Sequence, residues 1–479
     1  MVKKILLINP NFHYFPGWGQ TVLDYKQLPL GLAYIASYIK YYFNNQIDVM
    51  VCDAALENFD VSNVVNYIGK VNPDVVGISV HTATVTFVRN VVSKVKRLYP
   101  QVFVVLGGPH ITALPLENLD IADVCVVGEG EHTFAELLQN LKQGLPFDNV
   151  NGIAFKKNGN CYMSQKRKLI DNLDELPFPA RELFSSSGYK YHYPYKFKNP
   201  YYETIITSRG CSFDCDFCLN DKMWDKQVRY RSLDNVYAEL EELMKSKELS
   251  LVHIGDDNFT GNIERVLEFC HRKQKYFSDL KWICHVRADS LTEILLKEMK
   301  KSGCLEVQMG AESGDDEILM NCGKKLKTAT IHKASQMLKK AGINNWSTFM
   351  IGNEKESESS VEKTIQFAKK IDPTYCSFLF LSPFPGTRCF DRFKAKRYLK
   401  TFDWQKYNFH AEPVFETELL SAKKMMQLRK RAYRKFYLRP RIIFRYALVL
   451  LKSGQCRLVL ANSFLLLRFL LGMIEKRER

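Results

Sequence analysis

Three cysteines that lie close together in the sequence, Cys211, Cys215 and Cys218, carry the side chains best suited to chemistry. Their spacing is Cys-x-x-x-Cys-x-x-Cys, on a stretch that follows a predicted strand at residues 203–207. Three thiolates on one loop can hold three corners of an iron–sulfur cube, and the fourth iron then stays open to a small molecule. An incomplete site of this kind indicates chemistry rather than a structural role.

Two simpler interpretations compete with the cluster. A structural zinc site usually needs four ligands, and the next candidates after the loop are His253 and Cys270, neither of them near it in the sequence. Zinc and iron–sulfur sites share soft thiolate ligands, and free Cys is also a common core residue. The rest of the chain favours the cluster.

The cysteine loop resembles the signature of the radical S-adenosylmethionine (SAM) superfamily, in which the residue before the third Cys is commonly aromatic. Here that residue is Phe217. Together with the domain before the loop, roughly residues 1 to 400 resemble the cobalamin-binding radical SAM enzymes. The resemblance implies a 4Fe-4S cluster on the three Cys, SAM bound to its open iron, and a bound cobalamin.

The composition is that of a folded protein of two or three domains. The chain has 479 residues, of which 46% are hydrophobic. Its 13 Cys and the lack of an N-terminal signal pattern predict a reducing, cytoplasmic location. Of the net charge of +16, residues 421–479 supply +14, from 16 Lys and Arg against two Glu.

Residues 1–145 are predicted to form a Rossmann-like domain, because short apolar runs alternate with amphipathic stretches. The expected strands are 5–9, 47–53, 75–80, 102–106 and 124–127, and the expected helices are 30–42, 61–70, 85–98 and 133–142. Ligands of such folds bind at the carboxyl ends of the strands. Those ends are rich in small residues, which let a large ligand approach or simply make tight turns. No G-x-G-x-x-G opens the first helix, so a dinucleotide is disfavoured.

Three pieces of this domain, Pro73–Ser79, Gly107–His110 and Val127–Phe134, together resemble the cobalamin-binding domain of these enzymes. The motif Asp-x-His-x-x-Gly, which supplies an axial His in other cobalamin proteins, is absent. The resemblance therefore implies cobalamin without a protein His on cobalt. His81 and His110 could contradict this, and we assign them to the nucleotide tail or to structural roles. The implied cobalamin contacts are Asn9, Pro10, Ser79, His81, Gly107, Gly108, His110, Gly128 and Glu129.

Residues 146–200 are predicted to be a linker. Two extended runs, 150–156 and 161–166, flank an Asn-Gly pair that favours a hairpin turn. A proline-rich connector follows. The segment 189–202, dense in Tyr, Lys and Pro, is either a substrate entrance or a surface loop.

Residues 201–395 are predicted to form a partial (β/α)6 barrel, with six strands that begin near residues 204, 251, 282, 305, 346 and 375. Active sites of such barrels lie at the carboxyl ends of the strands, where the cysteine loop falls. The resemblance implies SAM contacts there from Phe217, Asp256, Asp257, Arg287, Glu312, Ser313 and Gly352. Each acidic residue could instead be a helix cap or a solvated carboxylate. The family usually has Leu-Pro-Gly-Glu after the fifth strand, whereas this chain has Asn353–Glu356.

Residues 396–479 are predicted to be a basic, amphipathic helical tail. Such a composition suits a helix that lies on an anionic membrane surface, and the alternative is a helix that packs on the barrel. The apolar run 458–474 is too short, and with Arg468 too charged, to span a bilayer comfortably. We expect a cytoplasmic protein with peripheral contact to the inner membrane surface, and no nucleic acid partner.

The leading functional hypothesis, by resemblance, is a cobalamin-dependent radical SAM enzyme that methylates an unactivated carbon of a small-molecule substrate through a 5′-deoxyadenosyl radical. The expected electron donor is a flavodoxin or ferredoxin. One alternative is a non-methylating relative, similar to the anaerobic magnesium-protoporphyrin ester cyclase. A third hypothesis is a non-catalytic cobalamin or zinc protein. No side chain is assigned to the catalytic step itself.

Overall fold

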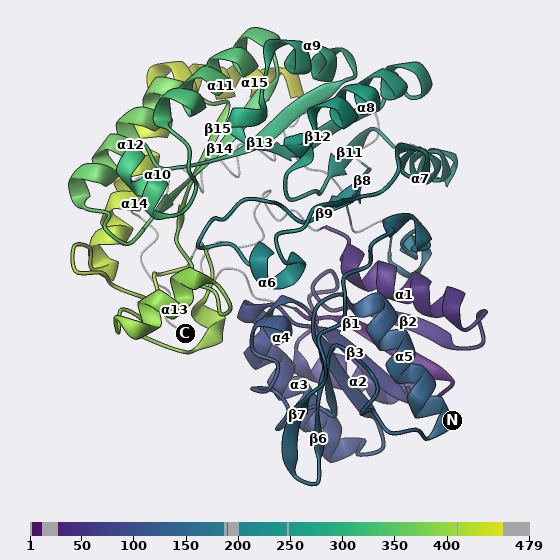
Figure 1. Cartoon of the computed structure of the whole chain (residues 1–479). Helices are drawn as coiled ribbons and strands as arrows, with labels where there is room; N and C mark the ends of the chain where they lie inside the picture. Colours follow the sequence, from purple (N-terminus) through teal and green to yellow (C-terminus); the bar gives the residue numbers. More distant parts are fainter. Residues whose placement is uncertain are drawn as a thin grey trace.

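The chain folds into two α/β modules followed by a helical tail (Figure 1). This computed structural model describes residues 2–11, 27–185, 189, 201–246, 249–409 and 411–453, with side chains as far as residue 448. The apolar run 458–474 and most of the segment 189–202 lie outside these residues.

The first module is a seven-stranded sheet with the order β2-β1-β3-β4-β5-β6-β7. Strands β1 to β5 are parallel, as expected, and helices cover the sheet. The strands are β1 (Lys4–Asn9), β2 (Asp48–Asp53), β3 (Val75–Ser79), β4 (Phe103–Gly107), β5 (Val124–Val126), β6 (Ile153–Lys157) and β7 (Asn160–Met163). The helices are α1 (Leu30–Tyr42), α2 (Val61–Val71), η1 (Thr82–Thr84), α3 (Val85–Leu98), α4 (Pro109–Ala113) and α5 (Gly130–Gln143).

The predicted hairpin forms, but it belongs to this sheet. Strands β6 and β7 are antiparallel, and β6 pairs with β5. The hairpin covers what would otherwise be the open edge of β5, which explains why a segment assigned to the linker by sequence extends the first module. The connector continues through η2 (Leu173–Glu175) and η3 (Arg181–Leu183).

The second module is the predicted partial barrel of six parallel strands, in the order β15-β14-β13-β12-β11-β8. The strands are β8 (Tyr202–Ile205), β11 (Leu251–Ile254), β12 (Lys281–Val286), β13 (Cys304–Glu312), β14 (Asn344–Ile351) and β15 (Tyr375–Phe380). The short strands β9 (Ser208–Arg209) and β10 (Arg229–Tyr230) form a separate antiparallel pair.

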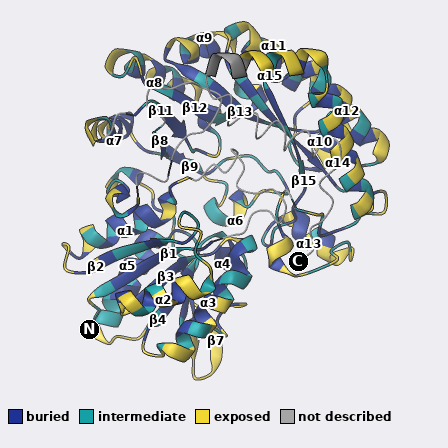
Figure 2. Ribbon diagram, turned by 180° about the vertical axis from the view of Figure 1, so that it is seen from behind, coloured by how far each residue is buried: buried dark blue, intermediate teal, exposed yellow. Residues whose placement is uncertain are grey.

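Helices of the second module follow the outside of the barrel (Figure 1). Apolar side chains of these helices and of the strand faces beneath them form one buried core, which appears dark blue in Figure 2. The helices are α6 (Asn220–Trp224), α7 (Leu233–Ser246), η4 (Phe259–Gly261), α8 (Ile263–Tyr276), η5 (Ala288–Ser290), α9 (Glu293–Lys301), α10 (Asp316–Asn321), α11 (Thr328–Ala341), α12 (Glu358–Ile371) and α13 (Arg388–Ala395).

The described part of the tail packs on the barrel. After η6 (Trp404–Lys406), helix α14 (Ala422–Tyr437) lies against α12 and β15, and buries four side chains: Met425, Leu428, Ala432 and Phe436. Its basic residues pair with acidic residues of α12: Lys424 with Glu358, and Lys435 with Glu362. Three arginines around the start of α15 (Pro440–Ser453) converge on Asp372: Arg439, Arg441 and Arg445. Many basic residues of the tail therefore form ion pairs with the barrel. This packing matches the second of the two predictions for the tail, that of a helix packed on the barrel.

Within the described residues, none of the helices is long and apolar enough to cross a membrane.

Candidate active site

The cysteine loop begins where β8 and β9 end, at the carboxyl edge of the barrel, as predicted. Two glycines allow its close packing. Gly210 has φ +95°, and a Cβ there would lie 1.9 Å from the Gln227 carbonyl oxygen. Gly323 has φ +72°, and a Cβ there would lie 2.3 Å from the Asp214 carbonyl oxygen. Only glycine fits such conformations and distances, so these two positions fix the path of the loop.

The three thiols are free of disulfides. Cys211 and Cys215 are half-buried, while Cys218 is exposed. Burial raises the pKa of all three thiols, that of Cys218 to about 11, so without metal they stay protonated at neutral pH. Among the described residues, no three His, Cys, Asp or Glu side chains gather around one point that could hold a single metal ion. Soft, unpaired thiols of this kind fit an iron–sulfur cluster, which would deprotonate them on binding.

The two acidic residues of the loop are engaged elsewhere. Asp214 pairs with Lys226 at 2.7 Å and with Arg388 at 2.8 Å. Asp216 pairs with Arg392 of α13 at 2.5 Å, and its backbone N–H donates to the Cys322 carbonyl. The loop is thereby tied to α10 and α13, while its carboxylates do not compete with the thiols. Phe217 packs against the barrel core.

Two cations lie beside the thiols. The Arg287 guanidinium lies 3.7 Å from the centroid of the Phe213 ring and donates to the Lys324 carbonyl. The Lys324 ammonium pairs with Glu312 at 2.9 Å, and its charge acts to lower the pKa of Cys215 against the larger effect of burial. Positive charge next to thiolates stabilises them. Arg287 and Glu312 were predicted from sequence, whereas Lys324 was not.

Glu312 has an unusual backbone. Its φ is +59°, and the register between β13 and β14 shifts at this residue. A non-glycine residue in the left-handed region is strained, and such strain clusters at functional sites. The bulge turns the end of β13 at the point where the Glu312 carboxylate meets the Lys324 ammonium.

The two neighbouring aspartates predicted to contact SAM differ sharply. Asp256 is buried, and its carboxylate accepts three hydrogen bonds of 2.6 Å, from the N–H and Oγ1 of Thr207 and from Oγ of Ser208. It therefore holds the connection between β8 and β9. Asp257 is exposed and accepts one bond, from the Gly210 N–H at 3.2 Å. Asp257 is the one whose carboxylate has room for a ligand.

Two other predicted SAM residues face away from open space. Ser313 is fully buried, with its hydroxyl 3.1 Å from Thr364 Oγ1. Gly352 lies under the tail, where a Cβ would meet the Phe415 ring at 2.6 Å and the Met425 sulfur at 2.9 Å. Only their backbone groups remain for a ligand.

At the carboxyl edge of the first sheet, small residues leave space. A Cβ on Gly128 would meet no atom within 4 Å. Gly107 and Gly108 are half-buried, and Gly108, at φ +100°, packs against the backbone of Val80. Ser79 is half-buried, Pro10 is buried, and Asn9 donates to Asp53. Open space lined by backbone and small side chains fits a large, flat cofactor such as cobalamin.

The two histidines of this edge have different surroundings. His110 is fully buried, its ring is edge-on to Trp404 at 5.4 Å, and burial lowers its pKa to about 4. His81 is exposed, yet burial lowers its pKa as well. Of the two histidines, only the side chain of His81 is therefore exposed at this edge.

A buried network of four charges joins the two modules, and sequence reasoning missed it. Arg209, two residues before Cys211, pairs with Glu129 and Glu131 of the first module, each at 2.6 Å. Arg229, its partner across the β9–β10 pair, reaches the other oxygen of Glu129 at 2.8 Å. All four side chains are 9% exposed or less.

Although burial alone would raise it, the two guanidiniums lower the pKa of Glu129. Its carboxylate, predicted to contact cobalamin, is occupied by these arginines and by the Ile170 N–H. The only signal in the sequence was the pair of acids in Gly128-Glu129-Gly130-Glu131.

A polar row lines the interior of the barrel. His285, Gln308 and Trp346 are register partners on β12, β13 and β14, and all three are half-buried. Side chains alternate along a strand, and the sequence neighbours of His285 and Gln308 belong to the buried core beneath the helices. His285 lies 2.9 Å from Gln308, and its ring is 5.1 Å from that of His253 on β11. These hydrogen-bonding groups suit a small polar substrate.

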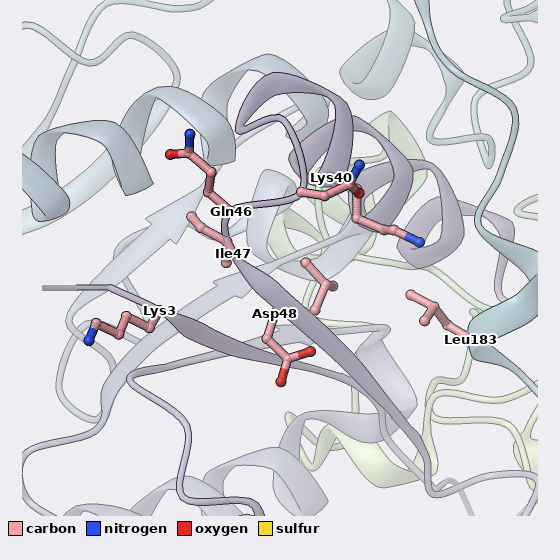
Figure 3. Close-up of a pocket in the computed structure, with 8 residues that line it drawn as sticks. Lys3, Lys40, Gln46, Ile47, Asp48 and Leu183 are labelled. Atoms are coloured by element: carbon pink, nitrogen blue, oxygen red, sulfur yellow. The ribbon is translucent and has the colours of Figure 1, made fainter.

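A separate surface hollow of about 440 Å³ lies elsewhere. It is lined by Lys3, Gln46 and Asp48 around the amino ends of β1 and β2, together with Lys40 and Leu183 (Figure 3). Ligands of parallel sheets bind at the opposite, carboxyl edge. It therefore plays no part in the site.

Comparisons with known proteins agree with this arrangement. The radical SAM superfamily matches residues 205–368, and the B12 binding domain matches residues 21–138. An uncharacterized methyltransferase of Pyrococcus horikoshii is 33% identical over 93% of this chain and 94% of its own length. The anaerobic magnesium-protoporphyrin IX monomethyl ester cyclase of Rubrivivax gelatinosus is 27% identical over 91% of this chain and 77% of its own length.

Among solved structures, the fold is similar to that of the radical SAM methyltransferase TsrM from Kitasatospora setae with cobalamin and a [4Fe-4S] cluster bound. The TM-score is 0.65 at 17% identity, over 83% of this chain and 75% of that one. This chain belongs to the cobalamin-binding radical SAM enzymes. Its cofactors are a 4Fe-4S cluster, SAM and cobalamin.

Proposed function

We propose that this enzyme methylates an unactivated carbon of a small, polar molecule. The observation that carries the proposal is the placement of the two open edges. The thiols with Asp257 lie at one edge, His81 and Gly128 lie at the other, and the ion pairs of Arg209 join the two modules. When bound, the cluster and SAM supply a radical that removes hydrogen, and cobalamin supplies the methyl group.

The chain's own residues would bind and orient the reactants. Cys211, Cys215 and Cys218 would hold the cluster, and Asp257 would accept from the amino group of SAM. Lys324 and Glu312 would sit near its carboxylate and ribose. In the barrel interior, His285 and Gln308 would orient the substrate by hydrogen bonds and Trp346 would pack beside it. No side chain needs to move a proton in this scheme.

The test is anaerobic turnover of the holoprotein with SAM, a flavodoxin or ferredoxin reductant and extracts of candidate metabolites. The expected result is 5′-deoxyadenosine, S-adenosylhomocysteine and a product heavier by one methylene unit. A product that has changed mass in any other way would refute methylation but keep the radical chemistry. It would favour the cyclase-like alternative, which the similarity to the Rubrivivax enzyme supports. If neither SAM product forms, the enzyme assignment itself fails.

We also propose that the end of the tail contacts an anionic membrane surface. Leu438, Ile443, Phe444 and Leu448 are exposed apolar side chains on or beside α15, next to exposed Arg441. Basic and apolar groups together bind such surfaces. Co-sedimentation with phosphatidylglycerol vesicles tests this: binding that an Ile443→Ser/Phe444→Ser variant loses supports it, and no binding in low salt overturns it.

A further inference from the structure

The first and the last cysteine of the loop are joined by one side chain, that of Asn220. This residue comes two positions after Cys218, at the start of α6, and is only 6% exposed. Its amide oxygen accepts from the Cys211 N–H at 2.8 Å, and its amide nitrogen donates to the Cys211 carbonyl. An Asn at the start of a helix commonly caps that helix. This one instead bonds both backbone groups of a cysteine nine residues earlier.

The main chain of Asn220 faces the last cysteine. Its N–H donates toward the Cys218 sulfur, and this bond acts to lower the pKa of the thiol against the larger effect of burial. The Cys218 N–H in turn donates to the Cys215 carbonyl at 3.2 Å. Hydrogen bonds to the sulfurs are among the factors that set the reduction potential of a cluster. Asn220 therefore meets one ligand residue with its side chain and another with its main chain.

The helix that carries Asn220 is anchored apart from the loop. Helix α6 packs against α4 of the first module (Figure 1). The ring of Trp224, at the end of α6, has its centroid 5.9 Å from Cζ of Arg209 and 5.5 Å from Cζ of Arg229. Both arginines belong to the buried ion-pair network, so they give the helix a fixed base. The amide therefore positions Cys211 from an anchored element.

We propose that Asn220 is a positioning residue for the iron–sulfur cluster: it fixes the separation of the Cys211 and Cys218 thiolates and holds its own N–H toward the Cys218 sulfur, and thereby sets the cluster's reduction potential. Without the amide, both backbone groups of Cys211 lose their partner and the loop can shift. The N–H of residue 220 would remain but would no longer be held toward the sulfur. The reduced cluster, which carries more negative charge, would then be stabilised less.

The proposal rests on the cluster, and on neither methylation nor the identity of the substrate. The first test uses the wild-type protein with its cluster reconstituted and reduced without oxygen, after iron and sulfide have been measured. Pulsed electron paramagnetic resonance detects nitrogen nuclei that couple to the reduced cluster, including those hydrogen-bonded to its sulfurs. The protein is prepared once with ordinary asparagine and once with nitrogen-15 asparagine. The expected result is a nitrogen coupling that changes with the label and loses this response in Asn220→Ala.

The second test is a redox titration of the cluster in Asn220→Ala at full iron content. At a fixed donor potential, the ratio of reduced to oxidised cluster should fall about tenfold, which corresponds to about 59 mV for a one-electron couple. Asn220→Asp should shift the ratio in the same direction, because its carboxylate repels the Cys211 carbonyl.

The matched control is Asn345→Ala. Asn345 lies on β14, is 4% exposed, and bonds the hydroxyls of Ser335 and Ser347. Its loss removes an equally buried amide at a place that does not touch the cysteine loop. The variant should lose stability but keep the wild-type potential. A purely structural role of Asn220 would give the same pattern in both Ala variants.

Three results would overturn the proposal. A wild-type spectrum that does not respond to labelled asparagine would place Asn220 away from the cluster. An unchanged potential in fully loaded Asn220→Ala would make the residue a brace of the loop without influence on the cluster. A wild-type protein that takes up no iron would refute the cluster itself. If Asn220→Ala alone takes up no iron, the labelled wild type and Asn220→Asp decide the question.

Discussion

The two edges that face each other across this molecule differ in kind. The carboxyl edge of the first sheet is built from glycines, Ser79 and a neutral histidine, and its two acids, Glu129 and Glu131, point into the other module. The carboxyl edge of the barrel carries the three thiols with Asp257, Arg287, Glu312 and Lys324. Both edges belong to parallel sheets, so the fold alone does not explain the difference.

The contrast follows from the ligands. A corrin is large and nearly flat, and it needs room and backbone contact, which glycines provide. SAM and a cluster are small and charged, and they need fixed charges in a site shielded from water. Four predictions test whether the first edge serves only cobalamin and the barrel edge only the cluster and SAM.

The largest effect is expected at the cluster. Cys215→Ala should reduce SAM cleavage to background, because two thiols cannot replace three, while cobalamin binding at the other edge should remain. Formation of 5′-deoxyadenosine and the content of iron and cobalt measure this. Cys161→Ala, an exposed thiol on β7, is the matched control and should change neither. Full turnover in Cys215→Ala would refute the cluster assignment.

The next effect concerns the network that joins the edges. Arg209→Met should lower the free energy of unfolding by about 3–5 kcal/mol, because it leaves two buried carboxylates with one cation. Adding Glu131→Gln should restore part of the loss. Urea unfolding measures both variants. Arg388→Ala, whose side chain is half exposed, is the control and should cost no more than about 1 kcal/mol. Equal losses in the two single variants would mean that the network does not hold the modules together.

A smaller effect should separate the two aspartates of the barrel edge. Asp256→Asn should lower stability by about 1–3 kcal/mol, because a buried amide cannot accept all three hydrogen bonds from Thr207 and Ser208. Asp257→Asn should leave stability nearly unchanged but raise the SAM concentration needed for half-maximal cleavage. Thermal unfolding and SAM titration distinguish the two, and a reversed pattern would exchange their roles.

The smallest effect is a change with pH. Glu356 follows β14 at the barrel edge and is fully buried; burial raises its pKa from 4.5 to about 8. The folded state therefore keeps a proton that the unfolded chain loses above pH 4.5, so wild-type stability falls as the pH rises toward 8. Glu356→Gln cannot lose this proton and keeps an acceptor for the Gly352 N–H. The melting temperature of Glu356→Gln minus that of the wild type should therefore increase from pH 5 to pH 8, as measured by thermal unfolding. A constant difference across that range would show that the carboxyl is ionised.

Much of the architecture was predictable because its signals are local. The alternation of apolar strands and amphipathic helices predicted both sheets, and α1 and α3 begin and end at the predicted residues. The hairpin at Asn158-Gly159 was also predictable, but its attachment to β5 was not, since pairing partners distant in sequence leave no local mark. For the same reason, the sequence left open whether α14 lies on a membrane or packs on the barrel. In the structure, its ion pairs with α12 hold it on the barrel.

The sequence by itself determined the chemistry: the spacing of the three Cys, the small residues at strand ends, and the family to which both belong. Only the tertiary structure decided how the individual side chains are used. In the tertiary structure, Asp256 accepts hydrogen bonds that fix the chain after β8, whereas Asp257 stays exposed. His110 is buried and His81 is not. The Glu129 carboxylate pairs with Arg209 rather than with a cofactor. The reason is physical: residue type sets what a group can do, whereas burial and partners, which come from segments far apart in the chain, set whether it is free to do it.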